Sequence, residues 1–185
     1  MNTVVTSKEK ILQTSRELLQ QQGWSAISIR AVAAGCHVSV GSIYNYFDSK
    51  EDLMGATIES VWCEIFHRSE DAAVFQDTQA CISWIYSRME YGCKAYPGFF
   101  SLHSMSLLQQ DKFDGRKRMQ QTWQHIIDGL CFVLKQDPKV RTDAFHAQFT
   151  LEQFADALFS LILSAFLRQD YNADPVLEIV RRVIY

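Results

Sequence analysis

The spacing of apolar residues along the chain predicts helices from one end to the other. In the first segment Ile11, Leu12, Leu18 and Leu19 fall on one helical face, and Gly23 follows where such a helix would end. No segment alternates between apolar and polar residues for long enough to predict a strand. The pattern therefore predicts an all-α protein.

Capping residues set the limits of the predicted helices. Thr6 stands three residues before a glutamate, which is the spacing of a capping box, and serines begin two short helices at residues 28–35 and 39–47. Longer helices are predicted over residues 50–68, 79–96, 99–110, 116–136, 150–168 and 174–184. We therefore predict a three-helix unit over residues 1–50 and a larger helical bundle over residues 51–185.

The two short helices and the turn between them have the features of a helix-turn-helix. A tight turn at Gly35-Cys36-His37 separates them, and His37 stands where a left-handed backbone is often needed. Crossing helices would bury a common apolar set: Trp24, Ile27, Ile29, Val32, Ala33, Val38, Ile43, Phe47 and Leu53. The face left exposed on the third helix is small and polar: Ser39, Val40, Gly41, Ser42, Tyr44, Asn45 and Tyr46. Such a face suits the major groove of DNA, and Lys50 at the next helix start could meet a phosphate.

Residues 7–54 resemble the TetR family of bacterial transcription regulators. The resemblance rests on Val32-Ala33, on the run Val38 to Phe47 (VSVGSIYNYF), on Ser49-Lys50-Glu51-Asp52-Leu53, and on Gly23-Trp24 and Ser28-Ile29-Arg30 upstream. It implies phosphate contacts by Tyr44, Tyr46 and Lys50, and contacts of Ser28 and Arg30 with the DNA backbone. It also implies that Ser39, Val40, Ser42 and Asn45 face the base edges of double-stranded DNA.

The distribution of charge indicates how the protein would bind DNA. The net charge is −3, and the cations of residues 1–53 only balance the anions there, so bulk charge does not favour nucleic acid. No Arg or Lys lies between Arg30 and Lys50, so the third helix has no arginine to read guanine. Val40 against a thymine methyl group and Asn45 against adenine predict an A·T-rich half-site. Few cations also favour a homodimer that places two modules about 34–36 Å apart on an inverted repeat.

The last two predicted helices offer an apolar surface for that dimer. Their apolar residues exceed what one helix pair would bury: Leu158, Leu161, Ile162, Ala165, Phe166, Val176, Ile179, Val180 and Val183. Two such pairs would pack as a four-helix bundle, and the family resemblance implies the same arrangement.

Several large side chains of the bundle are candidates for an effector cavity, with ordinary core packing as the alternative for each. They are Trp62, Phe66, Trp84, Phe100, His103, Met105, Trp123 and Phe154. The resemblance implies a repressor that leaves its operator when an unknown small molecule binds the bundle. Transcriptional activation and control by a protein partner are the alternatives, as is a helix-turn-helix that serves only as a scaffold.

The sequence lacks the signatures of several other classes. It has no Gly-rich phosphate loop, metal-ligand cluster or nucleophile–base pattern, so we expect no enzyme, no cofactor and no metal site. The five scattered cysteines form no C-x-x-C, which disfavours a disulfide framework or a zinc site and leaves redox sensing open. No signal-peptide pattern is present, and the most apolar run, residues 154–167, is too short to span a bilayer. We therefore expect a cytoplasmic protein with no membrane partner.

Overall fold

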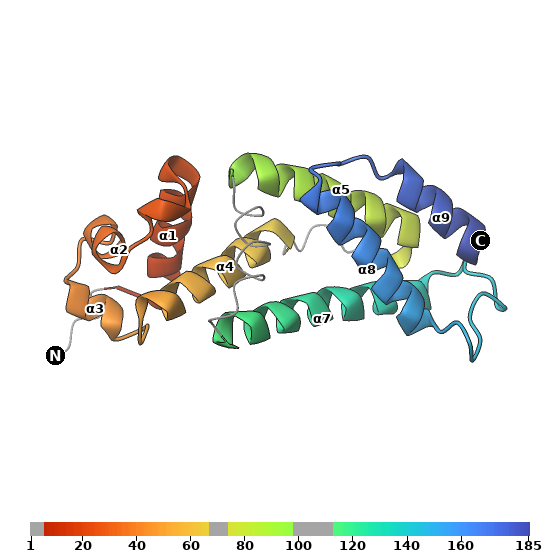
Figure 1. The fold of residues 1–185 in the computed structure, drawn as a ribbon, viewed down its shortest axis with the longest axis horizontal. Coiled ribbons are helices and arrows are strands. Elements are labelled where there is room, and N and C mark those ends of the chain that lie inside the picture. The colour runs from red at the N-terminus through yellow and green to blue at the C-terminus, as the bar shows by residue number, and fades with distance from the viewer. Residues whose placement is uncertain (1–5, 67–73, 98–112) are drawn as a thin grey trace. The chain divides into compact units, whose positions relative to one another are not determined.

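The structure is a computed structural model that describes residues 6–66, 74–97 and 113–185, except for the side chains of 113–119 and 122 (Figure 1). These residues form helices and connecting segments, with a single isolated bridge between two residues of one loop. The expected all-α class is confirmed.

The chain divides into two compact units. One consists of Met1–Ile65 and Gly92–Gln109, and the other of Phe66–Tyr91 and Gln110–Tyr185. The helix that begins at Lys50 therefore groups with the first unit almost to its end. The functional division between residues 50 and 51 stays a prediction.

Four helices, a short turn and the last residues of α5 (Thr78–Ala95) build the described part of the first unit. The four helices and the turn are α1 (Lys8–Gln22), a 3-10 turn (Trp24–Ala26), α2 (Ile29–Gly35), α3 (Val40–Tyr44) and α4 (Lys50–Phe66, whose last residue falls in the second unit). The predicted helix limits agree with these bounds to within a few residues.

Capping contacts explain where α1 begins and ends. Ser7 is the N-cap, because its hydroxyl accepts a hydrogen bond from the backbone N–H of Lys10 at 3.1 Å. The predicted capping box at Thr6 is therefore wrong by one residue. At the other end Gly23 has a φ of 78°, a left-handed value that favours glycine, and its N–H donates to the carbonyl of Leu19.

The core of the first unit follows the predicted apolar set. Seven of its members are buried where the short helices cross: Ile27, Ile29, Val32, Ala33, Ile43, Phe47 and Leu53. Trp24 and Val38 are only half-buried. Helix crossing is tight at Gly35, where an added Cβ would lie 2.6 Å from the buried Cγ2 of Thr14 on α1. A larger residue at position 35 would force α1 and α2 apart, because that methyl group belongs to a stiff β-branched side chain.

Arg16 joins α1 to α4 within the first unit. Its guanidinium donates to the hydroxyl of Ser60 and pairs with the carboxylate of Glu64 at 2.7 Å, both on α4. It also pairs with the carboxylate of Glu9, seven residues earlier on α1, at 3.2 Å. The Arg16 side chain is only 16% exposed, so water screens these contacts less than it would at an open surface. A displacement of α4 would therefore move α1 as well, through the contacts of Arg16.

The second unit contains four helices in its described part. They are α5 (Thr78–Ala95, in this unit up to Tyr91), α7 (Phe113–Gln136), α8 (Leu151–Leu167) and α9 (Asp174–Ile184). Helix α8 packs against both α7 and α9. A capping box at Thr150 and Gln153 starts α8, as predicted, and Pro175 occupies the first turn of α9. None of the helices in the described residues combines the length and apolar character needed to cross a membrane.

A buried carboxylate ties three segments of the second unit together. Asp137, at the end of α7, is 5% exposed and accepts hydrogen bonds from the N–H of Thr78, the N–H of Lys139 and the hydroxyl of Tyr185. Burial alone would raise the pKa of the Asp137 carboxyl, but these donors outweigh it and hold that pKa below its usual range. Burial first, and then Asp137, raises the pKa of Tyr185, which keeps its hydroxyl protonated as a donor.

Candidate nucleic-acid interface

The turn between α2 and α3 is held by backbone hydrogen bonds. The N–H groups of His37 and Val38 donate to the carbonyls of Ala34 and Ala33, each at 3.0 Å. His37 has a φ of 56°, so the predicted left-handed position in the turn is confirmed. The thiol of Cys36 donates to Thr14 Oγ1 at 3.3 Å and so fastens the turn to α1. These contacts fix the direction in which α3 leaves the turn.

The first turn of α3 combines a cap with an open surface. The hydroxyl of Ser39 accepts from the N–H of Ser42 at 3.2 Å, and the two hydroxyls lie 2.9 Å apart. Gly41 is exposed, and a Cβ added there would meet only the Ser39 hydroxyl, at an ordinary 3.7 Å. The fold itself therefore does not require glycine at this position, whereas close approach of another molecule to the backbone would.

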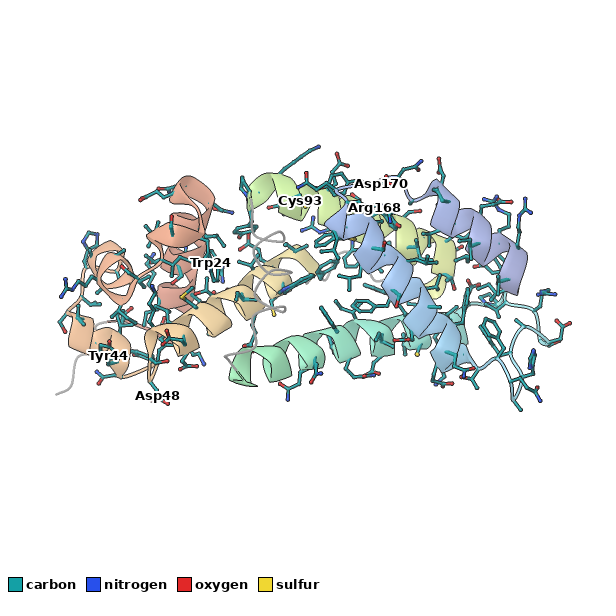
Figure 2. All side chains as sticks on the ribbon, in the orientation of Figure 1. Trp24, Tyr44, Asp48, Cys93, Arg168 and Asp170 are labelled. Carbon is teal, nitrogen blue, oxygen red and sulfur yellow. The ribbon has the colours of Figure 1, made fainter. Side chains whose placement is uncertain are left out.

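The exposed face of α3 and its C-terminal end is uncharged and combines apolar, aromatic and polar side chains. Val40 is 39% exposed and Tyr44 51%, and Asn45 and Tyr46 are also exposed, whereas Ile43 is fully buried on the opposite side. Figure 2 labels Tyr44 on α3, in the unit that also holds α1 and α2. The predicted division between a buried and an exposed side of this helix is confirmed.

The hydroxyl of Tyr46 has a partner inside the protein. It donates to the backbone carbonyl of Thr6 at 2.6 Å, across 40 residues of sequence. At the next residue along the chain, the ammonium of Lys8 lies 5.5 Å from the centre of the Phe47 ring. The family resemblance gave Tyr46 a phosphate contact and gave Lys8 no role, so these two contacts are features that sequence reasoning missed.

The other predicted DNA-contacting residues lie at helix starts. Ser28 caps α2 by accepting from the N–H of Ala31 at 3.1 Å, and Arg30 is exposed one residue into that helix. Lys50 is the exposed first residue of α4, behind Ser49, whose hydroxyl accepts from the N–H of Asp52 at 3.0 Å. Every predicted contact residue thus lies in the first unit, and what each one binds stays a prediction.

The effector candidates divide between the two units. Trp62 lies on α4 in the first unit, while Trp84 stacks edge-on with Phe66 and Phe75 in the second, at ring distances of 5.9 and 5.4 Å. Two further aromatic groups occur there, Trp123 with Phe159, and Phe154 with Phe145 and Phe149. Phe100, His103 and Met105 lie outside the described residues. The contacts of Phe154 fit core packing, and an effector cavity stays a prediction.

The predicted dimer residues differ in what covers them. Six are buried within the chain itself: Leu158, Ile162, Ala165, Phe166, Val176 and Val180. Leu161 and Ile179 remain 38% and 39% exposed, and Val183 is half-buried. Leu167 at the end of α8 is also exposed, which the prediction omitted. These residues are the ones that a partner would still have to cover.

The cysteines are all free thiols, and three of them are held protonated. Burial raises the pKa of Cys81 to about 12. Burial first, and then a nearby glutamate, raises the pKa of Cys63 and of Cys131 as well. Reactive cysteines need a depressed pKa, so these three thiols are poorly suited to redox sensing. In the part of the chain that is described, no group of three or more His, Cys, Asp or Glu side chains could hold a metal ion.

Comparison with known proteins matches one segment of the first unit to a family. Residues 11–57 match the family described as bacterial regulatory proteins, tetR family. An HTH-type transcriptional regulator from the lacX 3′ region of Lactococcus lactis subsp. lactis is 29% identical over 98 residues, 47% of this chain and 50% of that protein. The match thus spans half the length of that relative.

Two solved structures extend the likeness to the whole fold. The reduced form of NemR from E. coli has a TM-score of 0.68 at 19% identity, covering 96% of this chain and 97% of that one. BioQ, also solved from Mycobacterium smegmatis, has a TM-score of 0.54 at 14% identity in its structure with a double-stranded DNA operator, covering 89% and 86%. At such identities the likeness concerns the fold alone. Residues 11–57 thus match the tetR family of bacterial regulatory proteins, and the chain as a whole shares the fold of these two structures.

Proposed function

We propose that the protein is a transcription regulator that binds a specific double-stranded DNA sequence by placing α3 in the major groove. The observation that carries the proposal is the exposed face of α3, which is free of charge and closed by a serine cap at a helix-turn-helix. An α-helix fits the major groove, and the N-terminal residues of a recognition helix reach the base edges. BioQ, whose fold this chain shares, was solved with its DNA operator, which supports the same use of the fold here.

The residues of α3 favour recognition of A·T pairs. An exposed Val40 offers an apolar contact to the methyl group of thymine, and the amide of Asn45 can pair with both adenine groups in the major groove. Phosphate contacts come from Lys50, Arg30 and the hydroxyl of Tyr44 in this proposal. These contacts position the protein without reading sequence.

A homodimer on an inverted repeat completes the binding unit. One module with few cations gives little electrostatic affinity, and two modules double the number of phosphate contacts. The exposed Leu161, Leu167 and Ile179 on α8 and α9 supply apolar surface that a second copy would cover. We propose that this surface forms the dimer interface in the cytoplasm.

Repression relieved by a small molecule is the mode of regulation that we propose. An effector that moves α4 would move α1 through the contacts of Arg16 with Ser60 and Glu64. Allosteric coupling is typically about 1–3 kcal/mol, which changes operator affinity about 5- to 150-fold. Activation, or control by a protein partner, would use the same DNA-binding unit. A compound that binds the protein without changing its operator affinity is not the effector.

Selection of DNA from a random pool tests the proposed function. Purified protein is expected to enrich an A·T-leaning inverted repeat, with half-site centres about one helical turn or a multiple of it apart. Its affinity for that sequence is expected to exceed its affinity for a scrambled duplex by about 1,000-fold or more at physiological salt. A pool that shows no enrichment over several rounds would contradict the proposal.

A further inference from the structure

We propose that the start of α1 extends the DNA-contacting surface, with Lys8 binding a phosphate and the hydroxyl of Tyr46 positioning Lys8 rather than binding phosphate itself. This inference rests on the proposed function, because it names a further contact made by the same surface. Two contacts inside the first unit carry it, one from Tyr46 and one from Lys8.

The hydroxyl of Tyr46 has a single hydrogen to donate. That hydrogen goes to the carbonyl oxygen of Thr6, 2.6 Å away. Phosphate oxygens only accept hydrogen bonds, so Tyr46 cannot donate to a phosphate while it holds Thr6. Since Thr6 immediately precedes the N-cap Ser7, the bond fixes the beginning of α1 against the end of α3.

The ammonium of Lys8, the first residue of α1, lies over an aromatic ring just after α3. It lies 5.5 Å from the centre of the ring of Phe47, the residue that follows Tyr46. A cation over an aromatic face is attracted to it even at an exposed site, which restrains the lysine without neutralising its charge. Lys8 is exposed and has no ion pair among the described residues.

Another cation on this helix, Arg16, is already bound within the protein. The guanidinium of Arg16 is bound to Glu9, Glu64 and Ser60, so its charge is satisfied within the protein. Lys8 is therefore placed to offer a positive charge beside the exposed C-terminal end of α3. Because the cations of residues 1–53 only balance the anions there, one such contact is a substantial part of the electrostatic affinity.

The salt dependence of operator binding tests the role of Lys8. Lys8→Gln is expected to weaken binding to all duplexes alike and to reduce the slope of log affinity against log salt by about 0.9 for each bound protomer. Lys10→Gln is the matched control, because it removes the same charge from the same helix about 200° away around its axis. Its slope is expected to equal that of the wild-type protein.

A slope for Lys8→Gln equal to the wild-type slope would overturn the phosphate contact. An equal reduction in Lys10→Gln would also overturn it, because that result would assign the effect to net charge. Both results are read only against a wild-type protein that binds a selected operator. If the wild type enriches no sequence, the proposed function fails, which is a distinct result.

A double-variant cycle tests the positioning role of Tyr46. Tyr46→Phe removes the bond to Thr6 and is expected to weaken operator binding about 2- to 12-fold, the range given by one ordinary hydrogen bond. If Tyr46 acts through Lys8, the same change in a Lys8→Gln background is expected to have almost no further effect. Equal losses in the two backgrounds would show that Tyr46 contacts DNA independently and would overturn its positioning role.

Discussion

Gly41→Leu is expected to weaken operator binding about 100-fold or more while leaving the fold intact. A Cβ at residue 41 would meet only the hydroxyl of Ser39, at 3.7 Å, so the free protein accommodates it. Replacing glycine in a helix also favours folding by up to about 1 kcal/mol. In the groove, however, a leucine would occupy the space where the backbone of α3 approaches the bases. Operator affinity and thermal unfolding of the same preparation measure the two effects separately.

Gly129→Leu on α7 is the matched control for this change. Gly129 is also an exposed helical glycine, and nothing lies within 4 Å of a Cβ added there. It belongs to the second unit, whereas every proposed DNA contact belongs to the first. We expect it to leave operator affinity unchanged. Wild-type affinity in Gly41→Leu would mean that the first turn of α3 does not enter a groove.

Asp137→Ala is expected to lower the free energy of unfolding by about 3 kcal/mol. The substitution leaves the N–H of Thr78, the N–H of Lys139 and the hydroxyl of Tyr185 without their common acceptor. Each buried donor that loses its partner costs about 1–3 kcal/mol, and the losses at one acceptor do not simply add. The expected change corresponds to a fall in Tm of about 6–12 °C for a chain of this size. A Tm within 2 °C of the wild-type value would contradict this account.

The contribution of Asp137 is also expected to depend on pH. Because the pKa of Asp137 is lowered in the folded protein, its stabilising effect is complete above the unfolded-state pKa of about 3.9. It is lost as pH falls through the lower, folded-state pKa. The stability difference between wild type and Asp137→Asn should therefore shrink as pH falls from about 6 toward 3. A difference that is constant over this range would mean that the charge of Asp137 does not matter.

Local chemistry made the helix-turn-helix predictable from sequence. Ser28 and Ser39 cap the helices they precede, and His37 adopts the left-handed backbone that its place in the turn required. Each of these outcomes depends on residues within a few positions along the chain. At the start of α1, two adjacent capping residues were available, and sequence alone favoured Thr6 where the structure uses Ser7.

Contacts between distant residues were not predictable in the same way. The hydroxyl of Tyr46 meets Thr6 across 40 residues, and Asp137 joins Thr78 and Tyr185 across 59 and 48. No periodic pattern marks such pairs, because they depend on how helices pack. The predicted dimer interface was limited for the same reason, because burial of its residues also depends on helix packing. Periodicity found the apolar faces of α8 and α9, but it could not tell that the chain itself covers Leu158 and most of the others.

The central claim is tested most directly by measuring how each single base substitution in the selected operator changes the binding affinity. The measurement is made for the wild type and for Asn45→Ala, and the two profiles are compared. If α3 reads bases through its uncharged face, the largest penalties for the wild type, about 1–3 kcal/mol each, fall on A·T pairs. Asn45→Ala should then remove the penalty at one position in each half-site and leave the other positions as they were. The largest penalties at G·C pairs, or a profile that Asn45→Ala does not change, would contradict the claim.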